Sequence, residues 1–208
     1  MNPVGGRLFV IAAPSGAGKT SLVKALMARL PQLRFSISYT TRAQRPNEAD
    51  GRDYHFVSAE KFAEMVERGE FLEYARVFDN FYGTAAATVR EALRAGQRLL
   101  LEIDWQGARL VRERLPEARS IFILPPSLGA LDQRLRQRST DSDAVIRRRL
   151  QDSVADIGHW NEFDYVVIND RFDDALADLA AIVADQGDAL AAKRPQVERL
   201  AARLAAGG

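Results

Sequence analysis

The stretch that decides the fold is Ala13-Pro14-Ser15-Gly16-Ala17-Gly18-Lys19-Thr20. It follows an apolar, strand-like run at Leu8–Ala12 and opens a helix-like segment from Ser21 to Leu30. Glycines in such a turn let successive backbone N–H groups point inward around a phosphate, and the helix N-terminus adds partial positive charge. One position departs from the usual pattern, since Ala13 stands where the first glycine is expected. The strand, loop and helix together predict a binding site for a nucleoside triphosphate.

Two side chains of this stretch suit the chemistry of a bound triphosphate. Lys19 is placed to reach the outer phosphates, and the hydroxyl of Thr20 is an oxygen ligand for a nucleotide-bound Mg²⁺. The alternative is a glycine-rich turn between strand and helix that binds nothing. The run Gly18-Lys19-Thr20 in this context favours phosphate binding over that alternative.

The composition is that of a folded globular protein. The chain has 208 residues, of which 47% are hydrophobic and 27% charged, so it is long enough to bury a core. A net charge of +1 argues against a general nucleic-acid binder, and the lack of cysteine excludes disulfides, thiolate metal sites and thiol nucleophiles. No signal peptide or membrane-spanning run is found, so we expect a cytoplasmic protein without a membrane partner.

Four apolar runs alternate with helical patterns along the chain. These unbroken runs suit strands covered on both faces, as in a parallel sheet. The runs are Leu8–Ala12, Leu99–Ile103, Ser120–Leu124 and Tyr165–Ile168. Helices are predicted from Ser58 to Gly69, from Ala85 to Gly96, after a cap at Ser127, and from Asp143 with a buried stripe of Ile146, Leu150, Val154 and Ile157.

A segment between the first two runs has a different pattern. Phe35, Ile37 and Tyr39 alternate with polar residues, and the runs 53–57 and 71–77 are also strand-like, which predicts a small mixed or antiparallel sheet. We therefore predict an α/β fold: a doubly wound parallel sheet, a small mixed β insertion and a short helical lid. The predicted subregions of this single domain are the core at 7–34, 85–126 and 160–186, the insertion at 35–84, the lid at 127–159 and a helical tail at 187–208. A stripe at Val197, Leu200 and Leu204 indicates that the tail helix either docks on the chain or binds a partner.

The insertion carries motifs that narrow the acceptor. Ser38-Tyr39-Thr40-Thr41-Arg42 leads to Arg45-Pro46-Asn47-Glu48 and Gly51-Arg52-Asp53-Tyr54, and Tyr82-Gly83-Thr84 follows further on. From Leu8 to Asp170 the chain resembles the guanylate kinase family, which moves a phosphoryl group from ATP to GMP. The resemblance implies ATP and GMP as substrates, Mg²⁺ as cofactor and a role in purine nucleotide metabolism.

The resemblance implies a pocket that reads the guanine edge. Guanine offers N–H donors at N1 and N2 and an acceptor at O6, so a selective pocket needs carboxylates and hydroxyls. In the family, the positions of Glu73 and Asp104 take the donors and those of Ser38 and Thr84 face O6. The positions that hold the GMP phosphate are those of Arg42, Arg45, Tyr54 and Tyr82, which suit a dianion. Individually, these four residues could instead be solvated loop charges and packing aromatics.

Two carboxylates end the strand-like run 99–103. Glu102 and Asp104 are two residues apart and can point the same way. We assign Asp104 to GMP. The family more often has aspartate at the position of Glu102, which is a further candidate for ordering Mg²⁺ through water. Capping of a helix is the alternative role for either residue.

A second basic cluster matches the mobile lid of the family over ATP. Arg134 and Arg138 share a helix face, and the run Arg147-Arg148-Arg149 follows. The family arginines match Arg134, Arg138 and Arg149, so Arg147 and Arg148 are expected to face solvent. Asn169 matches a position near adenine, and its alternative role is that of a turn residue at a strand end. Lys19, Arg42, Arg138 and Arg149 are therefore the predicted catalytic residues, and Ala13–Ser21, Arg134, Arg138 and Asn169 the ATP contacts.

The implied activity is that of an ATP-dependent nucleoside monophosphate kinase. One rival is a related kinase with another acceptor, such as a ribose bisphosphate. Another is a catalytically dead, peptide-binding module, which typically lacks the lysine of the phosphate loop. The first rival is made less plausible by the residues implied to read guanine, Glu73, Asp104, Ser38 and Thr84. The second is made less plausible by the presence of Lys19. Monomer and homo-oligomer remain equally open.

Overall fold

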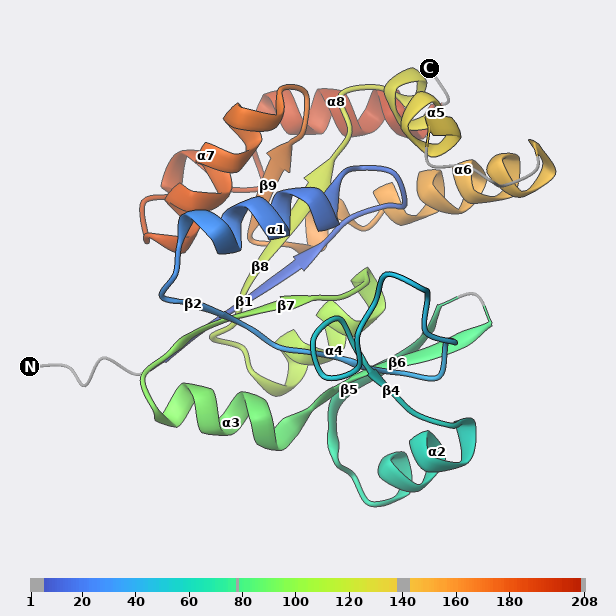
Figure 1. Cartoon of the computed structure of the whole chain (residues 1–208). Coiled ribbons are helices and arrows are strands. Elements are labelled where there is room, and N and C mark those ends of the chain that lie inside the picture. The colour runs from blue at the N-terminus through green and yellow to red at the C-terminus, as the bar shows by residue number, and fades with distance from the viewer. Residues whose placement is uncertain (1–5, 78, 138–142, 207–208) are drawn as a thin grey trace, which may run out of the picture. The chain divides into compact units, whose positions relative to one another are not determined.

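The computed structural model of the chain describes residues 6–77, 79–137 and 143–206. Its contacts divide the chain into two compact units, which we describe separately. The first unit extends to Val10 and takes up again from Gln32 to Ala118, and the second comprises Ile11–Pro31 and the chain from Arg119 onward. In Figure 1 the first unit carries helices α2, α3 and α4, and the second carries α1 and α5 to α8.

The strands form one sheet of five and one sheet of four. The order of the larger sheet is β2-β7-β1-β8-β9, and that of the smaller is β4-β3-β6-β5. The larger sheet contains β1 (Arg7–Ala12), β2 (Leu33–Phe35), β7 (Arg98–Glu102), β8 (Arg119–Leu124) and β9 (Tyr165–Ile168). The smaller contains β3 (Tyr39–Thr40), β4 (His55–Phe56), β5 (Phe71–Val77) and β6 (Asn80–Ala85). A parallel sheet with a separate mixed sheet confirms the predicted α/β fold class.

Helices connect most of these strands. They are α1 (Lys19–Arg29), α2 (Ala59–Glu67), α3 (Ala86–Arg94), α4 (Trp105–Arg114), α5 (Leu128–Gln137), α6 (Asp143–Ile157), α7 (Phe172–Val183) and α8 (Pro195–Ala205), with 3₁₀ turns η1 (Trp160–Glu162) and η2 (Asp188–Leu190). The predicted cap of α5 is confirmed, since Ser127 Oγ accepts from Ala130 N at 3.1 Å. Helix α2 begins where predicted, and there Ser58 acts as its cap, with Oγ accepting from Lys61 N at 3.1 Å. No helix among the described residues is long and apolar enough to span a bilayer.

In the first unit, β6 pairs antiparallel with β3 and with β5, which is an edge strand of the mixed sheet. The buried side chains of Phe62, Met65 and Phe71 join α2 to this sheet. A bulge shifts the register between Phe71 and Glu73, and Arg114 Nη1 donates to the carbonyls of Phe71 and Leu72 beside it. Bulges re-aim the next side chain of a strand, so this irregularity governs where Glu73 points.

The predicted strand-like alternation at Phe35–Tyr39 is wrong. Residues 36–38 lie outside any strand, because Phe35 ends β2 beside Leu100 of β7 whereas Tyr39 begins β3 beside Gly83 of β6. The chain therefore passes from the large sheet to the small one at this point, and the alternating polar residues line the crossing.

In the second unit, apolar faces of the helices make the core. Leu131 and Leu135 of α5 pack with Ile146 of α6. The tail helix α8 docks through its predicted stripe, since Val197, Leu200 and Leu204 are at most 5% exposed. Arg194 precedes α8 and donates to the carbonyl of Val166 in β9 at 2.6 Å. The docking interpretation of the tail is thus confirmed, and Arg194 satisfies a carbonyl of an edge strand.

Candidate nucleotide-binding sites

The phosphate loop has the predicted strand, loop and helix around it. Gly16 and Gly18 have φ values of 87° and 94°, which L side chains rarely adopt. A Cβ at Gly16 would also lie 3.0 Å from the side chain of Leu135. Gly18 is the N-cap of α1, and Lys19 and Thr20 are its first two residues. Backbone N–H groups without helical partners are therefore gathered at this end of α1, where an anion binds favourably.

Asn169 supports the loop from the end of β9. Its side chain is buried, and Nδ2 donates to the carbonyl of Ala17 at 2.8 Å. A Cβ at Gly18 would lie 2.4 Å from this same nitrogen, so the absence of a side chain at Gly18 lets the amide approach. Neither expected role, an adenine contact or a strand-end turn, includes this bond. The structure thus adds a supporting role for Asn169.

Arg134, a residue of α5, contacts Asn169. Its Nη2 donates to the carbonyl of Asn169 at 2.9 Å, while Nη1 is buried and has no hydrogen-bond partner among the described residues. An unused guanidinium donor in a buried position suits an anionic ligand. Arg138, the other arginine predicted on this face, lies outside the described residues.

Helix α6 brings a third arginine to the loop. Arg149 Nη2 donates to Ser15 Oγ at 3.3 Å, whereas Arg147 and Arg148 are exposed, as predicted. The 100° step between successive helical residues separates the three. The structure therefore brings together, within the second unit, the loop residues with Arg134, Arg149 and Asn169.

The predicted guanine pocket of the first unit centres on Glu73. Glu73 is 3% exposed, and its Oε1 accepts a hydrogen bond of 2.6 Å from the hydroxyl of Thr84, its cross-strand partner in β6. Burial raises the pKa of Glu73 to about 7, the nearby charge of Asp104 adds to this, and the bond from Thr84 opposes it. A buried carboxylate aligned by one hydroxyl is the type of group that selects N–H donors.

Asp104 lies at the start of α4 in the same unit. Its Oδ1 accepts from Gly107 N at 2.8 Å, so the capping alternative is confirmed for Asp104, while Glu102 ends β7. Capping uses one lone pair of the carboxylate and leaves acceptor capacity for a ligand. Asp104 therefore lies close to Glu73, whereas Glu102 lies two residues earlier, at the end of β7.

Gly107 is a residue of this pocket that the sequence analysis missed. A Cβ at Gly107 would lie 2.5 Å from Glu73 Oε2 and 3.2 Å from Asp104 Oδ1. The glycine thus provides the space that the Glu73 carboxylate occupies against the first turn of α4. Its φ is ordinary, and no sequence pattern indicates the close approach.

We expect Gly107→Ala to raise KM for GMP about tenfold or more, because the added methyl group must displace one of the two carboxylates that are predicted to bind guanine. Steady-state kinetics with GMP as the varied substrate measures the effect. Gly129→Ala is the matched control, since a Cβ at this exposed position of α5 would meet nothing closer than 3.8 Å. A KM for GMP equal in both variants and the wild type would contradict the close approach.

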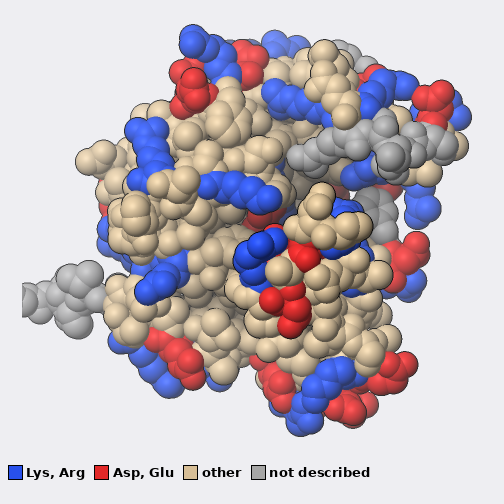
Figure 2. All heavy atoms as spheres, in the orientation of Figure 1, with Lys and Arg blue, Asp and Glu red and all other residues tan. Residues whose placement is uncertain are grey.

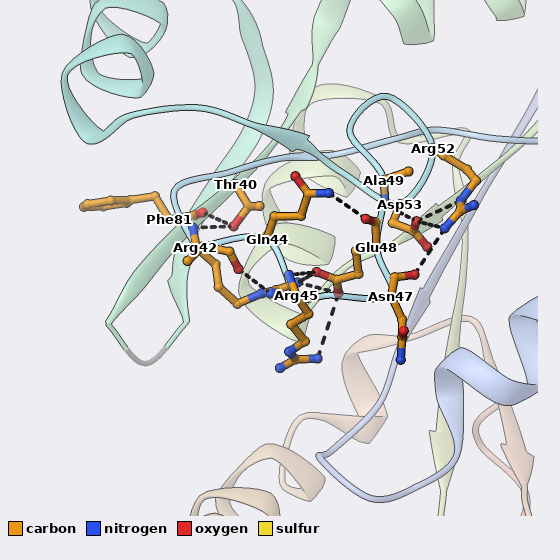
Figure 3. Close-up of polar contacts among 11 residues, drawn as sticks. Thr40, Arg42, Gln44, Arg45, Asn47, Glu48, Ala49, Arg52, Asp53 and Phe81 are labelled. Carbon is orange, nitrogen blue, oxygen red and sulfur yellow. Dashed lines mark hydrogen bonds and ion pairs between the residues drawn. The ribbon is translucent and has the colours of Figure 1, made fainter.

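The predicted phosphate-binding arginines are joined by Glu48, to which the sequence analysis assigned no role. Arg42 Nη2 donates to both carboxylate oxygens of Glu48, at 2.7 and 2.9 Å, and Arg45 N donates to Oε2 at 2.9 Å. Figure 3 shows the Glu48 carboxylate beside the side chains of both Arg42 and Arg45. Burial would raise the pKa of Glu48, but these hydrogen bonds outweigh it and hold the pKa below its usual value.

The tyrosines of the predicted phosphate site lie in the same cluster. The rings of Tyr54 and Tyr82 are 5.8 Å apart, and the Arg42 guanidinium carbon lies 5.4 Å from the Tyr54 ring centre. Burial raises the pKa of Tyr54 to about 12, so its hydroxyl keeps a proton to donate. Arg45 is largely exposed, with 71% of its side chain accessible. The structure thus brings together Arg42, Tyr54 and Tyr82. Arg45 lies at the exposed edge of this cluster.

Two serines flank the crossing between the sheets. Ser38, predicted to face O6 of guanine, is 8% exposed. Ser36 is 2% exposed, and its hydroxyl has no hydrogen-bond partner among the described residues. An unpaired buried hydroxyl is unusual, and it marks residues 36–38 as a place where a polar group of a ligand or a water is expected.

We expect Glu48→Ala to raise KM for GMP about five- to tenfold, the scale of about 1–1.5 kcal/mol for a half-buried charged contact. The reason is that Arg42 would lose its orienting partner and the loop 42–48 a shared acceptor. Glu64→Ala, at an exposed carboxylate paired only with exposed cations, is the control. A lower KM for GMP would mean that Glu48 competes with the phosphate instead.

Charges of both signs are spread over the face shown in Figure 2, in keeping with the net charge of +1. The described residues contain no cluster of three His, Cys, Asp or Glu side chains arranged for a metal ion. Thr20 and Glu102 are thus the metal candidates that the sequence offers, and they lie in different units.

Comparisons with known proteins give one family. The profile of the family described as guanylate kinase matches residues 5–186. A guanylate kinase of Methylococcus capsulatus is 54% identical over 199 residues, 96% of this chain and 98% of that protein. One from Pseudomonas fluorescens is 55% identical over 192 residues, 92% of each chain. The crystal structure of guanylate kinase from Anaplasma phagocytophilum matches with a TM-score of 0.74 and 31% identity, covering 94% of this chain and 93% of that one.

Proposed function

The chain belongs to the guanylate kinase family, and on that premise we propose which residues carry each part of its reaction. The activity of this family is transfer of the γ-phosphoryl group of ATP to GMP, which yields ADP and GDP. The chain is accordingly an ATP-dependent nucleoside monophosphate kinase.

We assign ATP to the second unit. Its proposed contacts are Ala13–Ser21, Arg134, Arg138, Arg149 and Asn169. The loop geometry, the α1 N-terminus and the unused Nη1 donor of Arg134 support this assignment for the described members. Lys19 and the arginines supply the positive charge that a triphosphate needs.

We assign GMP to the first unit. Its proposed contacts are Ser38, Arg42, Arg45, Tyr54, Glu73, Tyr82, Thr84 and Asp104. The observation that carries this assignment is the buried Glu73 carboxylate, aligned by Thr84 and next to Asp104. A carboxylate there accepts from the N1 and N2 hydrogens of guanine, whereas adenine presents an acceptor at N1 and would face it with repulsion.

The chemistry needs charge stabilisation rather than a general base. The phosphate of GMP has a second pKa near 6 and is largely ionised at neutral pH. The enzyme must bring two anions together and stabilise the transferring group, for which Lys19, Arg42, Arg138 and Arg149 are the proposed catalytic residues. We propose in-line transfer without a covalent intermediate on the protein.

Mg²⁺ is the proposed cofactor. The donor chemistry fits, since Mg²⁺ takes oxygen ligands, keeps several waters and is commonly held by one or two protein groups together with nucleotide phosphates. Thr20, in the first turn of α1, would supply its hydroxyl, and Glu102 would order a metal-bound water. When bound, the ion would neutralise charge on the phosphates. The proposed location is the cytoplasm, in keeping with a chain that has no cysteine.

An ADP-release assay across GMP, dGMP, AMP and UMP tests the proposal. We expect turnover with GMP and dGMP and little with AMP or UMP, because the pocket reads the guanine edge and has no predicted contact to the 2′-hydroxyl. Turnover with AMP equal to that with GMP would contradict the assignment of Glu73.

A further inference from the structure

Helix α6 has a serine on its buried face where a regular apolar stripe was predicted. Ser153 is fully buried, while the predicted stripe member Val154 is only half-buried. Ser153 lies seven residues after Ile146 and four before Ile157, so it shares their face of the helix. A hydroxyl at such a position needs a hydrogen-bond partner.

Ser153 has two acceptors within reach. Its Oγ lies 3.1 Å from the carbonyl oxygen of Ser15, at the turn of the phosphate loop, and 2.7 Å from the carbonyl oxygen of Arg149 in its own helix. A hydroxyl has one proton, so it either divides that proton between the two carbonyls or donates to one at a time. One acceptor joins α6 to the loop, and the other does not.

Arg149 contacts the same loop residue from one helical turn earlier. Its Nη2 donates to Ser15 Oγ at 3.3 Å. The backbone of Ser15 is thus approached by Ser153 and its side chain by Arg149. Two neighbouring contacts on one loop residue restrict how α6 can rotate or slide, and therefore where the Arg149 guanidinium lies.

We propose that Ser153 is a positioning residue for phosphoryl transfer: by donating to the Ser15 carbonyl it holds α6 on the phosphate loop and sets Arg149 in place. This inference rests on the proposed function, in which the loop binds ATP and Arg149 contacts its phosphates. Because Ser153 is fully buried, we assign it no contact with substrate.

The second acceptor keeps the Ser153 hydroxyl paired when its contact with the phosphate loop is lost. If α6 moves away from the loop, the hydroxyl can still donate its hydrogen bond to the Arg149 carbonyl, as serines in helices commonly bond four residues back. No buried donor is then left unpaired, and separation avoids the penalty of an orphaned polar group.

The first test is Ser153→Ala. We expect kcat to fall about five- to tenfold, the effect of one lost hydrogen bond, with KM for GMP unchanged. Ser153→Thr, which keeps the hydroxyl, should restore most of kcat, and Ser153→Cys, of similar size with a weak donor, should fall between. Thermal unfolding of each variant shows whether it is folded. An unchanged kcat in folded Ser153→Ala would overturn the proposal.

A matched control separates positioning from packing. Val154→Ala removes apolar contact from the adjacent, half-buried position of α6 but no hydrogen bond. We expect this variant to lower the unfolding temperature and leave kcat near the wild-type value. A loss of kcat in Val154→Ala as large as in Ser153→Ala would show that any disturbance of α6 suffices, and would contradict a specific role for the hydroxyl.

A double-mutant cycle tests whether Ser153 acts through Arg149. If it does, Ser153→Ala added to Arg149→Ala should cause no further loss of kcat. If kcat of the double variant instead falls by the product of the two single losses, the proposal is refuted. If Arg149→Ala alone leaves kcat unchanged, the catalytic assignment of Arg149 fails and the inference fails with it. If Arg149→Ala slows turnover but Ser153→Ala does not, the inference alone fails and the proposed function stands.

Discussion

Lys19→Ala is expected to lower kcat about a hundred- to a thousandfold, the usual cost of removing one preorganised group that stabilises charge in the transition state. Lys19 is the first residue of α1, at the N-terminus where the loop gathers its backbone donors. No other side chain is predicted to place a point charge on the outer phosphates from this position. Affinity for GMP should be nearly unchanged, since the proposed GMP contacts lie in the first unit.

Single-turnover kinetics with saturating GMP, together with calorimetric titration of GMP, measures both quantities. Lys24→Ala is the control, because this lysine lies further along α1 and is exposed. Equal kcat for Lys19→Ala and Lys24→Ala would refute the assignment of the phosphate loop, and a comparable loss of GMP affinity would mean that Lys19→Ala disturbs more than ATP.

Glu73→Gln is expected to weaken GMP binding by about 1.5–3 kcal/mol, the scale for a hydrogen bond to a charged partner. Glutamine keeps the size of the side chain but loses the charge and one of the two acceptors. Calorimetry at pH 8, where most of the wild-type carboxyl is ionised, compares the two proteins directly. Glu70→Gln, at an exposed glutamate beside the same strand, controls for the removal of charge. Equal affinities would refute the pocket.

The raised pKa of Glu73 also predicts a pH dependence. Burial places this pKa at about 7, so below pH 7 the free protein holds Glu73 largely neutral. Binding of the N1 and N2 hydrogens needs the carboxylate, so affinity for GMP should rise as the pH increases from 6 to 8, with release of a proton on binding. Ionisation of the GMP phosphate acts in the same direction, but Glu73→Gln retains only that part of the dependence. An identical pH profile for Glu73→Gln and the wild type would contradict ionisation of Glu73 on binding.

The raised pKa of Glu73 also affects the stability of the folded protein. The folded protein binds the Glu73 proton more tightly than the unfolded chain, in which the pKa of the carboxyl has its ordinary value of 4.5. Ionisation of Glu73 therefore lowers the free energy of unfolding. The contribution of Glu73 to stability falls as the pH rises from about 4.5 to 7. Ionising this buried group has a cost, which the N–H donors of GMP would offset in the proposed complex.

Much of the fold could be predicted because local signals and burial agree. Ser58 and Ser127 cap helices where the pattern placed them, and the four apolar runs became strands of one sheet. Strand β6 was missed because Gly83 interrupts it, and glycine weakens a strand. The structure gives the reason for that glycine: a Cβ would lie 2.9 Å from the ring of Phe71. Helix α4 was missed because its buried face is only Gly107, Ala108 and Val111.

The residue types of the candidate sites could be predicted from the sequence, but the contacts between those residues could not. The phosphate loop follows from its motif, and the two carboxylates proposed to bind guanine follow from the resemblance to the family. Glu48 and Ser153 were missed because their roles depend on partners that folding brings close: Arg42 across a loop, and Ser15, which is 138 residues away in the chain. Periodicity predicts that a face is buried, and it does not predict that a hydroxyl on that face finds an acceptor.

The most direct test of the central claim, that the first unit selects guanine through Glu73, is calorimetric titration of the unmodified chain with GMP and, in parallel, with AMP. We expect a saturable heat with GMP, at one site per chain, and none with AMP at the same concentrations. Absence of heat with GMP, or equal binding of both nucleotides, would contradict it.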